Sequence, residues 1–337
     1  EMISTISALI KNRKSGNSPS LQSPITFTTP LGDILLAGSG DDIHHLDRPM
    51  LLLIDCGGND IYRGSYALTD RNRPFSIVID LGGRDIYQSE LQPFGSVCGI
   101  FGLAALFDLG PESDTYEGKT RCFGYSFGGV SLLYDESGDS TYQAESLCFG
   151  ASEAGISFLL DGGGDDRYSS YHDSQGYGAF GGLGFLGDER GNDTYIAQAT
   201  PVINPSPQLA DRNTSASQGF GTGRFGPTLD GRSLPGGIGL LCDREGNDTY
   251  ESGVFAQGAG YGYGIGVLLD ENGDDTYRAA WYAMGAAAHQ GAGFLLDATG
   301  DDRYEATHYM MGGAASDFSL AILVDGDGND SYRAQNA

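Results

Sequence analysis

The sequence is poor in lysine and in long apolar runs, and each shortage excludes a class of protein. Only three of its 337 residues are lysine (Lys11, Lys14 and Lys119), and 19 basic residues stand against 45 acidic ones. The formal charge of −26 repels nucleic acid and anionic lipid, so nucleic acid is excluded as a partner and metal cations are expected instead. No apolar run approaches the roughly 18 residues of a membrane-spanning helix, so no membrane span is predicted.

Cysteine is scarce as well, and its spacing argues against a zinc site. The five cysteines include no CxxC pair and no cluster with histidine. Cys122 and Cys148 occupy equivalent places in successive repeats of the chain. Free thiols are expected there, because parallel side-chain vectors suit a disulfide poorly.

Glycine, in contrast, is abundant, and it recurs with a period. The 54 glycines accompany only 12 prolines and 39% hydrophobic residues, which indicates recurrent tight turns rather than a disordered linker. A unit of 25–28 residues recurs about eleven times, from LLAGSGDDIH (35–44) through IGVLLDENGDDTY (265–277) to LAILVDGDGNDSY (320–332). An apolar run, a Gly-Asp turn, a tyrosine and a Gly-rich second half are typical of one coil of a β-helix. The sequence therefore predicts an all-β, right-handed parallel β-helix.

The ends and one interruption of the repeat define the predicted domains. Residues 1–34 are not repetitive and predict an N-terminal cap, with a short helix over 1–12 from the helical spacing of its apolar residues. Residues 35–337 form the predicted β-helix. One spacing between repeats is doubled, and the Pro/Ser/Asn-rich stretch at about 198–237 predicts a surface excursion with a degenerate coil at 217–230 inside it.

Coils stacked about 4.8 Å apart turn equivalent residues into columns. A tyrosine column is expected to stack along one edge and stabilise the solenoid, or else to form a track for sugars or aromatic ligands. Its members are Tyr62, Tyr87, Tyr116, Tyr142, Tyr168, Tyr195, Tyr250, Tyr277, Tyr304 and Tyr332. The apolar run of each coil predicts a strand buried on both faces, under the N-terminal or excursion segment or against a partner.

Two aspartate columns flank the Gly-Asp turn and predict a metal site. Like charges stacked at this spacing repel, and Ca²⁺ tolerates irregular cages of carboxylate and carbonyl oxygens. The predicted ligands are Asp55, Asp60, Asp80, Asp85, Asp161, Asp166, Asp188, Asp193, Asp243, Asp248, Asp270, Asp275, Asp297, Asp302, Asp325 and Asp330. Ser140 interrupts the second column. The alternative is a set of side chains that bind backbone N–H groups of the turns without metal.

The turns also resemble a known family. Stretches such as DREGNDTY (243–250) and DGDGNDSY (325–332) are similar to the G-x-G-N/D-D core of RTX-type calcium-binding nonapeptide repeats. The resemblance covers about nine residues of each coil between residues 36 and 332. It implies several Ca²⁺ ions between successive turns, held by the second aspartate column and by backbone carbonyls. The chain departs from the family in having one such turn per coil instead of two tandem nonapeptides.

One further pair of residues is a candidate catalytic dyad. His289 and Asp317 stand eight residues before the leading aspartate in consecutive coils, so they should come within hydrogen-bonding reach. A histidine beside a carboxylate can act as a general base. The alternative is a histidine with a structural role only.

The leading hypothesis from the sequence is a non-enzymatic, calcium-stabilised β-solenoid that serves as a structural or binding module in a larger protein or assembly. The apolar strand face is expected to contact a protein partner or a second copy. The alternative is a carbohydrate-active β-helix enzyme, a polysaccharide lyase or hydrolase. The sequence starts with Glu1 rather than Met, which we interpret as a processed start. An extracellular, cell-surface or periplasmic location is therefore expected, with a leader removed.

Overall fold

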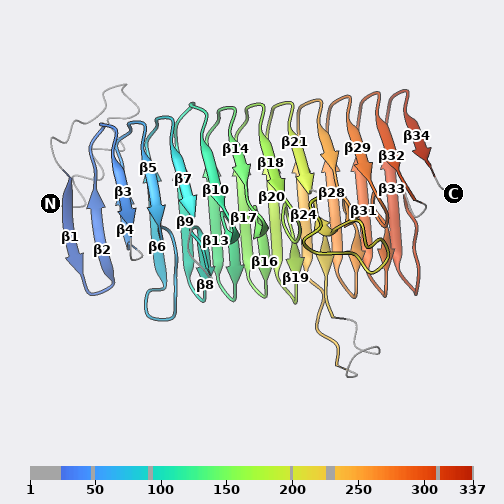
Figure 1. Cartoon of the computed structure of the whole chain (residues 1–337), viewed down its shortest axis with the longest axis horizontal. Coiled ribbons are helices and arrows are strands. Elements are labelled where there is room, and N and C mark those ends of the chain that lie inside the picture. The colour runs from blue at the N-terminus through green and yellow to red at the C-terminus, as the bar shows by residue number, and fades with distance from the viewer. Residues whose placement is uncertain are drawn as a thin grey trace.

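The structure, a computed structural model, describes residues 24–46, 50–89, 94–197, 200–224, 232–308 and 312–335. Over these residues the protein is all-β, and its strands stack into a β-solenoid of about ten turns (Figure 1). The predicted parallel β-solenoid is thus confirmed. The described part of the chain contains no helix long and apolar enough to cross a membrane.

Sheet A carries the apolar run of each coil and ends at the leading aspartate. Equivalent residues pair in register, as Asp243 does with Asp270. Strand β1 pairs antiparallel with β2, and the following strands are parallel. The strands are β1 (Ile25–Thr29), β2 (Gly32–Leu36), β4 (Leu52–Ile54), β6 (Phe75–Asp80), β9 (Leu103–Asp108), β13 (Val130–Asp135), β17 (Ile156–Asp161), β20 (Leu183–Asp188), β24 (Ile238–Asp243), β28 (Ile265–Asp270), β31 (Ala292–Asp297) and β33 (Leu320–Asp325).

Sheet B follows the Gly-Asp turn and carries the tyrosine of each coil. Its strands pair in parallel, with tyrosine beside tyrosine, as Tyr250 lies beside Tyr277. They are β3 (Ile43–Leu46), β5 (Ile61–Gly64), β7 (Ile86–Ser89), β10 (Thr115–Gly118), β14 (Thr141–Gln143), β18 (Arg167–Ser170), β21 (Thr194–Ala197), β25 (Thr249–Glu251), β29 (Thr276–Ala279), β32 (Arg303–Ala306) and β34 (Ser331–Ala334).

Sheet C forms the third side of the solenoid from the Gly-rich half of each coil. Its strands are β8 (Cys98–Ile100), β12 (Tyr125–Phe127), β16 (Ala151–Glu153), β19 (Gly178–Ala179), β23 (Gly221–Thr222), β27 (Gly260–Tyr261) and β30 (Ala287–Ala288). Two short pairs, β11 (Thr120–Cys122) with β15 (Ser146–Cys148) and β22 (Thr214–Ser217) with β26 (Val254–Ala256), connect sheets B and C.

From β6 to β31 the strands of sheet A bury one face only, so the predicted burial of both faces is wrong over this length. At β2 and β4 the outward Ile34, Leu36 and Ile54 are buried as well, in a separate apolar cluster, as predicted. In β28 the burial alternates: Gly266, Leu268 and Asp270 are buried, while Val267 and Leu269 are only partly buried. The inward column packs with the tyrosines in the main core cluster. The outward apolar side chains pack only against their neighbours on the sheet surface, so they remain partly exposed to solvent.

The excursion does not contain an extra coil. Strand β20 pairs directly with β24 in sheet A, and β21 pairs directly with β25 in sheet B. The stretch expected to be a degenerate coil contributes β23 to sheet C, so it is the Gly-rich half of the coil that began at β20. The doubled spacing comes from loops on both sides of this half-coil.

The N-terminal cap is described only from residue 24 onward. Within that part, β1 and β2 form an antiparallel hairpin at the edge of sheet A, at the end marked N in Figure 1. The helix predicted over residues 1–12 lies outside the described residues.

Candidate metal centre

The tyrosine column forms a continuous stack inside the solenoid. Neighbouring rings lie with centroids 4.5–4.9 Å apart, as for Tyr116 and Tyr142 (4.5 Å) and Tyr195 and Tyr250 (4.9 Å). The predicted stacking is confirmed, but the rings from Tyr62 to Tyr304 are fully buried rather than lying along an accessible edge. A sugar track along these rings is therefore excluded, and their hydroxyl groups need partners in the core.

The leading aspartates supply those partners. The hydroxyl of Tyr250 donates to Oδ2 of Asp270 in the next coil over 2.7 Å, and Tyr168 does the same to Asp188 over 2.7 Å. The other leading oxygen, Oδ1, can accept a backbone N–H of the turn, as Asp161 does from Gly163 over 3.0 Å. The tyrosines from Tyr62 to Tyr277 thus tie one coil to the next through a buried carboxylate.

The second aspartate column forms a hydrogen-bond ladder with the backbone. Oδ1 of Asp275 accepts the N–H of Asp248, the equivalent residue one coil earlier, over 2.6 Å, and Oδ1 of Asp302 accepts that of Asp275 over 2.7 Å. The exposed residue just before each second aspartate forms another ladder, in which the side chain accepts a hydrogen bond from the following coil instead of the preceding one. The N–H of Asp301, for example, donates to Oδ1 of Asp274 over 2.9 Å. The Asn/Asp-Asp pair of each turn is thus explained by coil-to-coil hydrogen bonds, as the metal-free alternative proposed.

These ladders leave one oxygen of nearly every second aspartate unused. Oδ2 is buried and accepts no hydrogen bond from a backbone or hydroxyl donor in Asp60, Asp85, Asp114, Asp166, Asp193, Asp248, Asp275 and Asp302. In several coils the second carboxyl group instead lies within hydrogen-bonding reach of the leading one, as Asp275 does of Asp270, so that only a proton or a cation can link the two. A buried carboxylate oxygen without a donor is strongly unfavourable. The ladder alone therefore does not complete the interior.

The unused oxygens lie close enough to the leading aspartates to share an ion. Eight groups among the described residues have ligand atoms within 4.8 Å of one another, and they include Asp60, Asp80 and Asp85; Asp85, Asp108 and Asp114; Asp161, Asp166 and Asp188; and Asp193, Asp243 and Asp248. Oxygens on opposite sides of a Ca²⁺ ion, each about 2.4 Å from it, would be separated by about this distance. The carboxylates present therefore fit a hard divalent cation.

Burial makes the ionised form of these columns costly without a counter-charge. Loss of solvation, together with repulsion from the neighbouring carboxylates Asp135 and Asp85, raises the pKa of Asp114 to about 8. The same desolvation raises the pKa of Asp60 to about 7 and that of Asp297 to about 6. Such a column must take up protons or bind cations.

The structure brings most of the predicted ligands into these columns. The leading and second aspartates from Asp55 to Asp302 are buried, and Asp325 and Asp330 of the last coil are partly exposed. Sequence reasoning missed Asp114, because the turn containing Pro111 is one residue longer and shifts it from the expected spacing. Its position two residues before Tyr116 was the available signal, since the second aspartate stands there in every other coil except that of Ser140.

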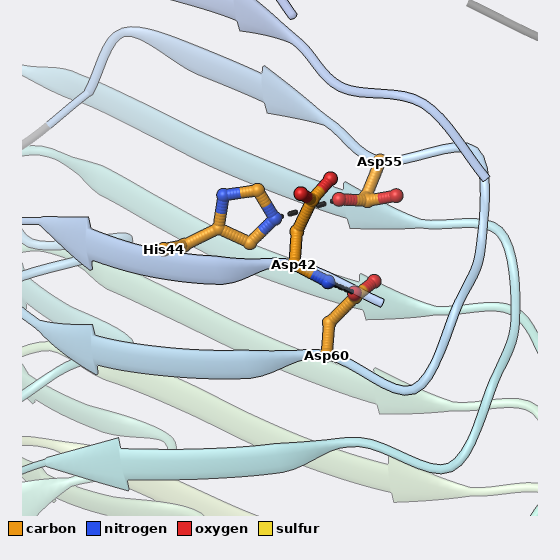
Figure 2. A group of neighbouring side chains, drawn as sticks. All are labelled: Asp42, His44, Asp55 and Asp60. Atoms are coloured by element: carbon orange, nitrogen blue, oxygen red, sulfur yellow. Dashed lines mark hydrogen bonds and ion pairs between the residues drawn. The ribbon is translucent and has the colours of Figure 1, made fainter. Parts of the chain in front are cut away.

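The first coil carries a histidine where later coils carry tyrosine. His44 pairs with Tyr62 in sheet B, and its Nε2 lies 2.6 Å from Oδ2 of Asp55. Figure 2 shows Asp42 and Asp60 beside this pair, and their ligand atoms all lie within 4.8 Å of one another. Sequence reasoning assigned no role to His44, although it stands two residues after Asp42, the spacing at which later coils carry the tyrosine.

His289 and Asp317 lie next to each other, as their spacing predicted. Nδ1 of His289 is 2.8 Å from Oδ2 of Asp317, and the two side chains are 31% and 59% exposed. The ring of His289 also meets Tyr261 edge to face, with centroids 4.9 Å apart. The pair is accessible, and its catalytic role stays a prediction.

Tyr261 also borders an aromatic groove outside sheet C. The groove has a volume of about 410 Å³ and lies between the excursion, at Pro207 and Gln208, and the sheet. Tyr177, Phe180, Phe220, Phe255, Tyr261 and Asp173 are among its lining residues. Aromatic walls with a few polar groups are typical of a small-molecule site.

Cys122 and Cys148 face each other on β11 and β15. Their Sγ atoms lie 3.0 Å apart, and both are buried free thiols, as expected. Burial raises the pKa of Cys122, so it stays protonated.

Comparison of the chain with protein-family models, curated proteins and solved structures found no match. The class of protein is therefore defined by its fold and site alone. It is an acidic β-solenoid with interior carboxylate clusters that could hold metal ions. The resemblance of the turns to RTX-type repeats concerns their sequence only.

Proposed function

We propose that the protein is a non-enzymatic, calcium-stabilised β-solenoid whose interior carboxylates hold Ca²⁺ ions between successive coils. The column of buried Oδ2 atoms that accept no backbone or hydroxyl donor carries this proposal. An ion beside each such oxygen supplies the missing electrostatic partner and leaves the backbone ladder through Oδ1 intact.

Charge balance supports a divalent ion. A regular coil contributes two interior carboxylates, such as Asp270 and Asp275, and one divalent cation per coil neutralises them. In one coil Ser140 replaces the second aspartate, and its hydroxyl donates to Asp135 over 3.2 Å. That coil carries one interior charge fewer, so we expect it to hold no divalent ion of its own.

The ligand set favours Ca²⁺ over other common ions. The regular coils offer only oxygen atoms, and Ca²⁺ accepts irregular cages of such atoms whereas Mg²⁺ demands near-octahedral geometry. The resemblance to RTX-type turns points to the same ion. Extracellular calcium modules work with weak sites, of about 10⁻⁴ to 10⁻³ M, because the ion is abundant there. We therefore propose an extracellular, cell-surface or periplasmic module of a larger assembly.

Thermal melts in Ca²⁺ and in EDTA test this function. Asp275→Ala should lower the melting temperature in Ca²⁺ because it removes a ligand from a regular coil. Ser140→Ala is the matched control, because it removes the buried hydrogen bonds to Asp135 and from the N–H of Asp114 but no carboxylate, so it should lower the melting temperature equally in Ca²⁺ and in EDTA. Equal melting curves in Ca²⁺ and EDTA for the wild-type protein would leave only the hydrogen-bonded ladder.

The aromatic groove favours a second candidate, a carbohydrate-binding or carbohydrate-active protein. Tyr261 lies between the groove and the His289–Asp317 pair, which places flat aromatic rings beside a candidate general base. Binding to a panel of polysaccharides, followed by product analysis, tests it. Loss of binding in Tyr261→Ala would support a sugar site, and loss of turnover alone in His289→Ala would support an enzyme. Absence of binding to the panel would reject this candidate.

A further inference from the structure

The outer face of sheet A is apolar along its length. The outward positions are the first, third and fifth residues of each strand from β6 to β33, as Ile265, Val267 and Leu269 are in β28. Leu, Ile, Val and Phe fill most of these positions, and no charged residue occupies any of them. Most of these side chains are partly or fully exposed.

Sheet B shows what a solvated outer face of the same solenoid looks like. Its outward positions flank the tyrosine and are mostly polar, with Gln143, Glu251 and Arg278 as examples. Arg278 even pairs with Glu305 of the next coil on this surface. The apolar character of sheet A is therefore a property of that face and does not follow from the repeat itself.

The size of this face fits a stable interface between proteins. Nine strands about 4.8 Å apart, with six residues at about 3.3 Å each, cover about 800 Å². The largest apolar patch of a typical monomer is about 300–600 Å². A standard protein interface buries about 800 Å² on each partner.

We propose that this face binds a second copy of the chain, sheet A against sheet A. Two sheets with apolar faces pack about 10 Å apart as a β-sandwich. The face is built from the same repeated pattern at every coil and runs straight along the molecule, so it is complementary in shape to itself (Figure 1). A hollow of about 290 Å³ around Gly187 leaves room for a side chain of the second copy.

Charge selects one of the two possible two-fold arrangements. Each strand of sheet A ends at the acidic turn, where Asp165, Asp274 and Asp301 are exposed. Most strands begin after an uncharged glycine, such as Gly155 or Gly264. A two-fold axis parallel to the solenoid axis sets the acidic edge of one copy against the glycine edge of the other. An axis parallel to the strands would align the two acidic edges, which repel. The first arrangement places equivalent coils opposite each other.

Sedimentation equilibrium in Ca²⁺ tests the interface. The wild-type protein should have the mass of a dimer, and Leu240→Lys, at the centre of the outer face, should have that of a monomer with an unchanged circular dichroism spectrum. Gln143→Lys, on the polar face of sheet B, is the matched control and should stay dimeric. A monomeric wild type, or a dimer that survives Leu240→Lys, would overturn the proposal. A monomer that binds neutral phosphatidylcholine vesicles would assign the face to lipid instead.

Disulfide trapping tests the arrangement. In a Cys242→Ser background, Ile77→Cys on β6 and Phe294→Cys on β31 should each form a disulfide-linked dimer on mild oxidation, because equivalent coils face each other. Gln143→Cys should remain monomeric on a denaturing gel. If neither single variant crosslinks alone and a crosslink forms only when the two variants are mixed, the two copies are antiparallel and the proposed arrangement is overturned.

Discussion

At the scale of single residues, the glycine of each turn is fixed by the close approach of neighbouring coils. Gly300 has a φ of 152°, and a Cβ added there would lie 1.5 Å from the carbonyl oxygen of Gly273. Gly191 meets Gly164 in the same way, at 1.5 Å. The motif therefore needs glycine for space as well as for backbone conformation.

Gly300→Ala should lower the free energy of unfolding by about 3 kcal/mol, because the methyl group forces two coils apart. Gly40→Ala is the control, since nothing lies within 4 Å of a Cβ at that turn. Urea denaturation of both variants measures the difference. Equal stability of the two would show that the coils can separate at this turn without strain.

The buried tyrosine hydroxyls should contribute to stability as well. Tyr250→Phe removes the donor to Asp270 and leaves that buried carboxylate without it, so we expect a loss of about 2 kcal/mol. Tyr332→Phe, in the half-exposed last ring, should lose much less. Chemical denaturation checks both variants, and an unchanged Tyr250→Phe would mean that the hydroxyl contributes nothing to stability.

At the scale of the coil, the sequence predicts the order of its parts but not how neighbouring coils complete one another. The apolar run, the turn and the tyrosine each follow from local pattern, and the tyrosine stack follows from the repeat. The hydrogen bonds of Asp274 and Asp275 run in opposite directions between coils, and only coordinates reveal them. An apolar run with side chains on both faces cannot show how far each face is covered, so burial of the outer face of sheet A was predicted correctly at β2 and β4 and wrongly from β6 onward.

Asp275→Asn separates the two roles of the second aspartate. The amide oxygen keeps the bond to the N–H of Asp248, while the charge that an ion would neutralise is removed. The variant should bind one ion fewer and melt lower in Ca²⁺, yet melt higher than the wild type in EDTA, because a buried carboxylate is gone. Asp274→Asn, in the exposed ladder, should change neither melt. A lower melting temperature for Asp275→Asn in EDTA as well would assign the carboxylate to the ladder alone.

At the scale of the whole molecule, the interior columns set how stability depends on pH. Asp114 faces Asp85, Asp108 and Asp135, and its pKa is raised from 3.8 to about 8, chiefly by desolvation. Between these two values the folded, metal-free state binds more protons than the unfolded state. Stability without metal should therefore be greatest in acid and fall as the pH rises from about 4 to 8.

Calcium should reverse this dependence, because the ion binds the ionised carboxylates and competes with protons. The gap between the melting temperatures in Ca²⁺ and in EDTA should therefore widen steadily from pH 5 to pH 8. Melts in matched buffers measure it. A gap that stays constant or narrows over this range would mean that the titrating carboxylates are not the calcium ligands.

The most direct test of the calcium-loaded interior is the number of ions bound to the folded protein. Equilibrium dialysis of the protein against radiolabelled Ca²⁺, at a free concentration above the weak site affinities proposed, should show several ions per chain, about one for each coil with both interior aspartates. Asp275→Asn should lose one of them. A folded chain that binds no calcium in this dialysis would contradict the proposal and leave a solenoid held together by protonated carboxylates.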